Sequence, residues 1–526
     1  MTRVRRSAAL VLAIVLSAAV AAAQPAAPPD FDAFVARVMK TFEVPGLSVA
    51  IVKDGETFAK GYGVRKLGDP APVDARTLFG IASNTKVFTA AALGLLVEEG
   101  RLRWDGRVID YLPWFQMYDP YVTRELTVRD LLVHRSGLGL GAGDLLWWPP
   151  STYNRREIAA RLRYIEPAAG FRAAYAYDNV LYLIAGEVIE AISGQSWEDF
   201  VGSRILAKVG MAGSNLQHSD AGRAGNVAAT HARVDGVVRP IAPFLSDNTN
   251  PAGGINSSAE DMAKWVRVLL SRGALPGGTR VFSEATWRQL TTLVTPIPIG
   301  AGPKELDAVR PNFNGYALGL GVRDYRGEKM LTHTGGLPGY VSRVAWIPAR
   351  QLGVVVLTNQ ESEDAFNAIV NHVLDHHLGA KGTDWVETYR VLAGRQQTAF
   401  DEAEKKAMAA RDTSSRPSLP LAKYAGRYRD AWYGDVTLTE ENGRLVMQFV
   451  PTPALVGTLE HFQHDTFIVR WRDRELRADA YVQFALRPDG SIDRVTMEAV
   501  SPLTDFSYDF QDLRLVPVKE KGSEQP

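Results

Sequence analysis

The chain of 526 residues contains no cysteine. Disulfide bonds, thiolate metal sites and a cysteine nucleophile are therefore excluded, and the stability of the fold must rest on packing. There is also no excess of charge, since 59 Lys and Arg residues balance 59 Asp and Glu residues without a long run of one sign. We therefore expect neither a nucleic acid nor another polyanion as a partner.

Long apolar runs are equally scarce, and the one that stands out lies at the N-terminus. Three arginines among the first six residues precede an apolar run over 8–20, and a stretch of alanines ends at Ala23. This layout is typical of a bacterial secretory signal peptide over 1–23 with an Ala-x-Ala cleavage site, because the run is short for a membrane span. An uncleaved anchor is the alternative. The sequence predicts a periplasmic or secreted protein with no membrane span once the signal is removed.

A chain of this length exceeds one ordinary core, so we expect two domains or one large domain with an appendage. In the first part, strand-like segments at both ends flank a helix-rich middle, which predicts an α+β or α/β arrangement with one antiparallel sheet. Strands are expected at 47–52, 57–64, 330–333, 343–347 and 352–357, and helices at 30–43, 87–97, 126–133, 179–192, 257–270 and 364–378.

The last part of the chain has a different pattern. A long, charged amphipathic helix is expected over 384–411, and the segment 413–420 has the composition of a linker. About seven short runs rich in Tyr, Val, Phe and Thr follow, which indicate a small all-β domain of barrel or sandwich type. The predicted domains are 24–380, a helical linker at 381–420 and an all-β domain at 421–518.

The first domain is organised around the segment Gly80 to Lys86, which precedes a buried apolar helix. Ser83 and Lys86 are three residues apart, so on a helical turn their side chains lie on one face and can meet. Lysine can remove the proton of a serine hydroxyl if burial and a helix N-terminus lower its pKa towards neutrality. A Ser-x-x-Lys pattern alone is weak, because chance produces about one or two in a chain this long.

Two further motifs indicate that the pair of Ser83 and Lys86 is catalytic. The sequence reads SNTK at 83–86, YDN at 177–179 and HTG at 333–335. Their order and spacing resemble the three motifs of the penicillin-binding protein and serine β-lactamase family, closest to the branch of class C β-lactamases, D-peptidases and esterases. The resemblance extends over about 30–378 and implies the β-lactamase/transpeptidase-like α+β fold with a helical subdomain. The C-terminal part, with DAWYGDVTL at 430–438, is similar to the lipocalin-like β domains appended to many such hydrolases.

The resemblance also implies roles for individual residues. Ser83 attacks a carbonyl, Lys86 activates it, and Tyr177 passes protons as a phenolate or as a hydrogen-bonded shuttle. Asn179 holds Lys86 and the substrate amide. The residues expected to bind the substrate along one strand are His333, Thr334, Gly335 and Gly336, with the backbone N–H groups of Ser83 and Gly336 as the oxyanion hole.

Some features leave alternatives open. Tyr175 competes with Tyr177 for the second motif, but no asparagine stands two positions after it. Many members of the family carry lysine where this chain has His333, which is mostly neutral at pH 7, so recognition of a substrate carboxylate is in doubt. Glu166 precedes Tyr177, whereas the deacylating glutamate of class A β-lactamases follows their second motif.

Two other segments each allow two interpretations. The Gly-rich segment 137–150, which ends in two tryptophans and two prolines, either walls an apolar acyl pocket or packs on the body of the domain. Three histidines at 372, 376 and 377 have helical spacing but no obvious further ligand, so no metal and no cofactor are predicted.

The sequence thus predicts an exported serine hydrolase that acts on a small molecule or short peptide through an acyl-Ser83 intermediate. A peptidase on small peptides, including peptides with D-residues, leads. A carboxylesterase or weak β-lactamase is the alternative, and a non-catalytic penicillin-binding sensor is the alternative of another class. The oligomeric state is not readable.

Overall fold

The computed structural model describes residues 26–223 and 225–519. The predicted signal peptide at 1–23 lies outside the described residues. In these two ranges, no helix has both the length and the apolar character that a membrane crossing requires.

An eight-stranded antiparallel sheet forms the centre of the first domain, in the order β2-β1-β12-β11-β10-β9-β8-β7. The strand from the N-terminal hairpin pairs with the last strand of the domain, with Leu47 opposite Thr358, which confirms the predicted meeting of the two ends. The strands are β1 (Gly46–Lys53), β2 (Glu56–Gly63), β7 (Thr295–Pro296), β8 (Asn314–Tyr316), β9 (Gly321–Tyr325), β10 (Glu328–Leu337), β11 (Tyr340–Ile347) and β12 (Leu352–Thr358).

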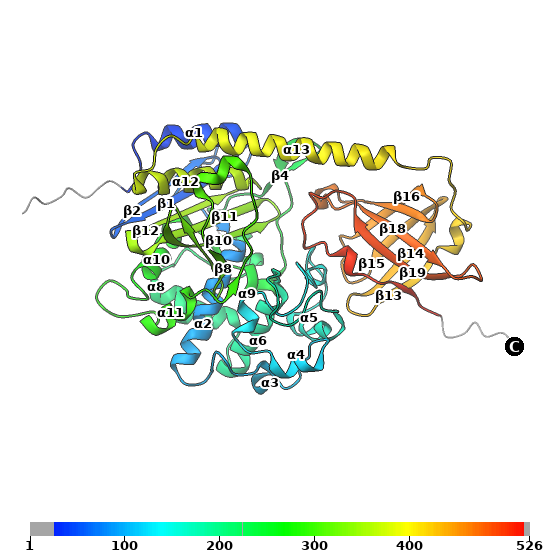
Figure 1. Ribbon diagram of the computed structural model, residues 1–526, viewed down its shortest axis with the longest axis horizontal. Coiled ribbons are helices and arrows are strands. Elements are labelled where there is room, and N and C mark those ends of the chain that lie inside the picture. The colour runs from blue at the N-terminus through cyan, green and yellow to red at the C-terminus, as the bar shows by residue number, and fades with distance from the viewer. Residues whose placement is uncertain (1–25, 224, 520–526) are drawn as a thin grey trace, which may run out of the picture.

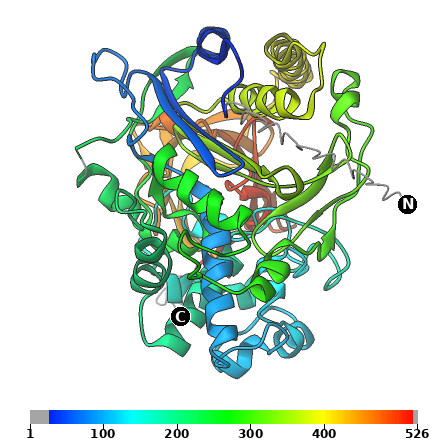
Figure 2. The same cartoon turned by 90° about the vertical axis from the view of Figure 1, so that its left-hand side faces the viewer.

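Helices cover both faces of this sheet (Figure 2). Side chains alternate along β1, so that Val49 and Ile51 join the core beneath α1 and α12, whereas Ala50 and Val52 face the core that contains α2 and α10. These helices are α1 (Phe31–Phe42), α2 (Lys86–Glu98), α10 (Ala259–Leu270) and α12 (Glu363–Leu378). The strands of both ends and the helices α1, α2, α10 and α12 are as the sequence predicted.

A mostly helical subdomain lies against the α2 side of the sheet (Figure 1). Its helices are α3 (Val108–Tyr111), α4 (Pro120–Glu125), α5 (Arg155–Arg161), α6 (Val180–Ser193), α7 (Trp197–Val201), α8 (Ala207–Val209), α9 (Asn250–Gly253) and α11 (Glu284–Thr291). Two short ribbons accompany them, β3 (Phe79–Gly80) with β6 (Asn256–Ser257) and β4 (His231–Val234) with β5 (Val237–Pro240).

The prediction of a helix over 126–133 is wrong. The structure has only a 3-10 turn there, Asp130–Leu132. In a helix that began at Leu126, the N–H of Arg129 would bond within the helix, but here it donates to the carbonyl of Trp104, and the N–H of Val128 donates to that of Gly106. Tertiary hydrogen bonds have overridden the local apolar periodicity.

The C-terminal domain is a nearly closed antiparallel barrel in the order β19-β18-β17-β16-β15-β14-β13-β20. The backbones of Val495 and Leu515 exchange two hydrogen bonds and bring the two ends of the sheet together. The strands are β13 (Gly426–Asp430), β14 (Gly434–Glu441), β15 (Arg444–Phe449), β16 (Val456–Gln463), β17 (Thr466–Trp471), β18 (Ala480–Leu486), β19 (Ile492–Ala499) and β20 (Val516–Pro517). The predicted all-β domain is confirmed.

The long helix α13 (Trp385–Ala409) runs from the sheet domain to the barrel, along the top of Figure 1. The barrel docks beside α5, where Tyr153 donates to the carbonyl of Tyr433 at 2.6 Å and Arg161 donates to that of Trp432 at 2.8 Å. The apolar core beneath α2 continues across this interface into the barrel. The domain boundaries at 380 and 420 stay predictions.

Candidate active site

Ser83 lies on a 3-10 turn, Ala82–Thr85, that leads directly into α2. Ala82 has a φ of 48°, a left-handed conformation that costs a non-glycine residue about 1–2 kcal/mol. The turn is tied down on both sides, since Ile81 donates to the carbonyl of Ile255 at 2.9 Å and accepts from the hydroxyl of Ser342 at 2.8 Å. Ser83 is therefore held at the positive end of α2 in a strained, rigid backbone.

Lys86 lies beneath Ser83 and is fully buried. Its Nζ donates to the hydroxyl oxygen of Ser83 at 2.9 Å and to Oδ1 of Asn179 at 2.7 Å. Burial lowers the pKa of Lys86 to about 7, although the carboxylates of Asp144 and Asp178 act in the opposite direction. A substantial fraction of Lys86 is therefore neutral near pH 7 and can accept the proton of Ser83.

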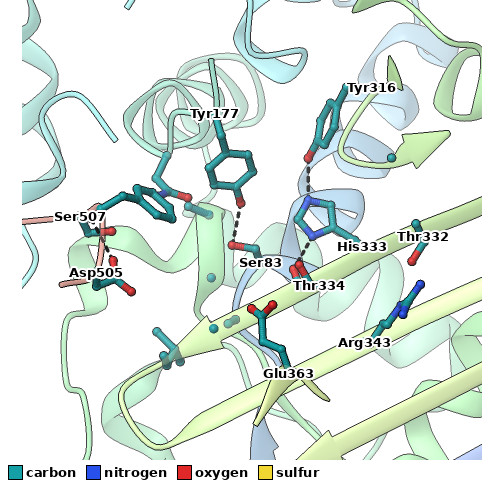
Figure 3. Close-up of a pocket in the computed structure, with 18 of the residues that line it drawn as sticks. Ser83, Tyr177, Tyr316, Thr332, His333, Thr334, Arg343, Glu363, Asp505 and Ser507 are labelled. Carbon is teal, nitrogen blue, oxygen red and sulfur yellow. Dashed lines mark hydrogen bonds between the residues drawn. The ribbon is translucent and has the colours of Figure 1, made fainter. Parts of the chain in front are cut away.

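Tyr177 approaches Ser83 from the other side (Figure 3), and its hydroxyl donates to Oγ of Ser83 at 2.8 Å. Burial raises the pKa of Tyr177 well above its ordinary value. This direction disfavours the phenolate and favours a protonated shuttle. Tyr175 lines the same cavity, and no partner of its hydroxyl is found among the described residues, so of these two tyrosines it is Tyr177 that contacts Ser83.

Asn179 precedes α6 and links Lys86 to a carboxyl group. Its Oδ1 accepts from Lys86, and its Nδ2 donates to Oδ2 of Asp144 at 2.8 Å. Asp144 is fully buried, and burial raises its pKa to about 8. The indole of Trp147 donates to the other oxygen of Asp144 at 3.1 Å.

The third motif lies on β10, which passes beside Ser83. Gly335 permits this approach, because a Cβ at that position would lie 2.2 Å from the carbonyl oxygen of Ile81. The Nδ1–H of His333 donates to the carbonyl of Thr334, so Nε2 accepts from the hydroxyl of Tyr316 at 2.6 Å. Burial and the charge of Lys86 lower the pKa of His333 to about 3. His333 is therefore neutral and supplies no positive charge to a substrate.

A cavity of 520 Å³ opens above these residues. Among the predicted site residues, it is lined by Ser83, Tyr177, Asn179, His333, Thr334 and Gly336. Lys86 lies below it, and Gly335 faces the Ser83 turn. Trp147 and Trp148 also line it, so the Gly-rich segment does wall the cavity, as one of its two interpretations predicted.

Sequence reasoning missed several residues of the site. His134, with a φ of 55°, packs its ring 4.3 Å from that of Tyr177 and accepts from the backbone N–H of Asp178 at 3.1 Å. Burial lowers the pKa of His134, so it is a neutral support. His134 directly follows the apolar segment 126–133, but its contact with Tyr177 could be known only from the fold.

The largest omission comes from the barrel. Asp505, Phe506 and Ser507, which follow β19, line the cavity of Ser83 (Figure 3). The hydroxyl of Ser507 donates to Oδ2 of Asp144 at 3.0 Å. Nothing in the local sequence around 505–509 signalled this contact.

The histidines of α12, which the sequence analysis considered as metal ligands, contact an aromatic ring and a backbone carbonyl. The ring of His372 stacks on that of Phe34 with centroids 3.7 Å apart, and His377 bonds to the carbonyl of Ala26 at 2.9 Å. In the described ranges, no group of three His, Cys, Asp or Glu side chains is arranged to hold a metal ion.

These features define a serine hydrolase site on a β-lactamase-like scaffold. Residues 31–378 match the Beta-lactamase family, and residues 410–517 match DUF3471, a domain of unknown function. The first match covers more than half of the chain, so the protein belongs to the Beta-lactamase family of serine hydrolases.

Individual relatives extend the likeness to both domains. The chain is 28% identical over 496 residues to the Unguisins hydrolase ungD of Aspergillus violaceofuscus, which covers 88% of this chain and 86% of that protein. The fold is similar to that of an octameric penicillin-binding protein homologue from Pyrococcus abyssi, with a TM-score of 0.58, 23% identity and coverage of 93% and 99% of the two chains. A D-stereospecific amidohydrolase from Streptomyces sp. has a TM-score of 0.52, 21% identity and coverage of 66% and 98%.

Proposed function

We propose that this protein is a peptidase that cleaves an amide bond of short peptides, including peptides with D-residues, through an acyl-Ser83 intermediate. One observation carries the proposal: the hydroxyl oxygen of Ser83 lies within hydrogen-bond distance of both a buried lysine and a protonated tyrosine. This arrangement provides a nucleophile, a base and a proton donor for a leaving amine at one place.

The reaction follows from these contacts. Oγ of Ser83 attacks the substrate carbonyl carbon while its proton moves to neutral Lys86. The tetrahedral intermediate collapses when the carbon–nitrogen bond breaks, and the leaving nitrogen takes a proton from Tyr177, which regains one from Lys86. A water molecule then attacks the acyl carbon and gives a proton to the same pair, and this proton passes to Oγ of Ser83 when the bond between Oγ and the acyl carbon breaks and the acid is released. The backbone N–H groups of Ser83 and Gly336 are the proposed oxyanion donors.

Substrate preference is inferred from the walls of the cavity. Trp147 and Trp148 favour an apolar acyl group. His333 is neutral and cannot bind a carboxylate by charge. Arg343 stands opposite Thr334 on the neighbouring strand β11 and lines the cavity, so it can supply a positive charge there. We propose Arg343 as the partner of a substrate carboxylate. The name of the Unguisins hydrolase supports a hydrolytic reaction, and that of the D-stereospecific amidohydrolase supports the choice of an amide bond and of D-residues.

A carboxylesterase is the second candidate, and the neutral His333 favours it, because an ester without a carboxylate needs no fixed cation beside the third motif. A weak β-lactamase uses the same residues. The non-catalytic sensor is disfavoured by the contact between Tyr177 and Ser83, which provides a route for deacylation.

The test is intact-mass spectrometry after brief exposure to a fluorophosphonate and, separately, to a penicillin. We expect a fluorophosphonate adduct at Ser83. A penicillin adduct that decays indicates deacylation, and one that persists supports the sensor. Turnover of matched peptide amides and esters, each with L- and D-residues, then separates peptidase from esterase. Absence of any adduct would overturn the acyl-serine proposal.

We also propose that the protein acts outside the cytoplasm, since residues 1–23 have the pattern of a signal peptide. The mass of the protein recovered from a periplasmic or culture fraction tests this. A mature N-terminus at Gln24 is expected, and an intact Met1 in the cytoplasmic fraction alone would contradict it.

A further inference from the structure

A loop of the barrel domain enters the site of Ser83. The loop, between β19 and β20, lies on the side of the barrel that faces the sheet domain (red in Figure 1). The ring of Phe506 stands edge to face with that of Tyr177, with centroids 6.1 Å apart. Gly141 makes room for it, because a Cβ there would lie 2.7 Å from the Phe506 ring. The barrel therefore contributes a wall of the cavity.

The same loop reaches the hydrogen-bond network below the cavity. Ser507 is buried, and its hydroxyl donates to the oxygen of Asp144 that also accepts from Asn179. With Trp147 on the other oxygen, three donors converge on one buried carboxyl group. A carboxyl oxygen that accepts from Nδ2 of Asn179 fixes the orientation of this amide, and Oδ1 is then turned towards Lys86.

A second side chain of the loop holds the backbone on either side of Asp144. The carboxyl oxygens of Asp509 accept from the N–H of Gly143 at 2.6 Å and from that of Leu145 at 3.0 Å. Asp509 is fully buried. Its neighbour Phe510 stacks on Trp471 in the barrel core, so the clamp is anchored in the rigid part of the barrel.

We propose that Ser507 and Asp509 are positioning residues of the active site, which hold Asp144 against Asn179 and thereby hold Lys86 beside Ser83. The proposal rests on the proposed function and adds a task for the C-terminal domain. The barrel is a structural part of the hydrolase site, because the network from Lys86 to the barrel consists of contacts between buried groups and contains no solvent-exposed step.

The network also affects the charge of the base. The ionisable groups that influence Lys86 are Asp144 and Asp178, and those that influence Asp144 are Lys86, Asp505 and Asp509. Negative charge on Asp144 raises the pKa of Lys86, and the hydrogen bond from Ser507 favours that charge. Because the pKa of Asp144 is about 8, its carboxyl group is mostly neutral below pH 7, so loss of the Ser507 hydroxyl should slow the labelling without moving the midpoint of its decline at low pH.

The experiment measures the rate of fluorophosphonate labelling against pH on the full-length protein. The variants are Ser507→Ala, Ser507→Thr, Asp144→Asn and Asp509→Asn. Ser501→Ala is the matched control, since it removes a hydroxyl from the same loop that bonds only within the loop, to the N–H of Leu503. Circular dichroism and a thermal melt of each variant show whether it is folded.

We expect Ser507→Ala to slow labelling about tenfold, the order of loss that follows when a buried acceptor is left without one of its donors. Asp144→Asn should have a larger effect on the rate, because it replaces an acceptor oxygen of the network, and Ser507→Thr should restore most of the rate. Ser501→Ala should resemble the wild type.

Each outcome decides a separate point. If the wild type is labelled and Ser507→Ala and Asp509→Asn behave like Ser501→Ala, the positioning role is wrong. If these variants melt earlier but keep the wild-type rate when folded, the loop only docks the barrel, and the role is again wrong. A wild type that resists labelling overturns the proposed function itself, and the positioning role with it.

Discussion

The Nζ of Lys86 lies 2.9 Å from the hydroxyl oxygen of Ser83. The other two partners of Nζ are the amide oxygen of Asn179 and the carbonyl of Ala252, so its contacts are neutral oxygens. A fully buried ammonium without a contacting carboxylate is costly, and the neutral amine is favoured. This relationship makes the lysine a base.

Replacing the nucleophile tests the centre of the site. Ser83→Ala removes the atom that forms the acyl bond, so we expect no fluorophosphonate adduct and no turnover, with a thermal melt close to that of the wild type. Ser271→Ala, at an exposed position after α10, is the matched control. Adduct formation in Ser83→Ala would assign the nucleophile to another residue.

The base gives a prediction about pH. Because the pKa of Lys86 is lowered to about 7, the neutral form falls about tenfold per unit below that pH, and the labelling rate should fall with it. Above about pH 7 the rate should level off. Lys86→Ala should lose a factor of at least about 100, whereas Lys40→Ala on α1 should not.

We expect the fall of the labelling rate at low pH (its acid limb) to reflect protonation of Lys86 and not protonation of an imidazole. His333, with a pKa of about 3, stays neutral from pH 5 to 8. His333→Gln should therefore lower the rate without moving the midpoint of the limb. A limb that disappears in this variant would transfer the titration to His333.

The second motif predicts an asymmetry between two tyrosines of one cavity. Tyr177→Phe removes the hydroxyl that donates to Ser83, so we expect at least about a 100-fold loss of turnover, as for removal of an acid–base group. Tyr175→Phe should lose less than about 10-fold in turnover, because the hydroxyl of Tyr175 makes no contact with Ser83. Equal losses would contradict the assignment of the shuttle to Tyr177.

Arg343 gives a prediction about substrates. Arg343→Met should raise KM for peptides with a free C-terminal carboxylate about 10-fold or more, the range of a charged hydrogen bond, and leave the corresponding C-terminal amides little changed. Arg350→Met, at an exposed turn after β11, is the control. An equal change for acid and amide peptides would show that Arg343 supports the sheet and does not bind the carboxylate.

Much of the fold followed from local patterns. Amphipathic periodicity located α1 and α12, and the strand-like runs at 47–52 and 57–64 located the two strands of the first hairpin. The pattern failed over 126–133, where Val128 and Arg129 donate to a neighbouring loop. A backbone donor that finds a tertiary partner is invisible to a periodicity argument.

The sequence by itself determined the pairing of Ser83 with Lys86, because three residues on a helical turn bring the two side chains together wherever the turn forms. It also determined which motifs belong with that pair, through their order along the chain. Only the tertiary structure decided that Asp144 holds Asn179 and that Ser507 holds Asp144, 363 positions away. Such contacts depend on how the barrel packs against the sheet domain, and no local pattern encodes that packing.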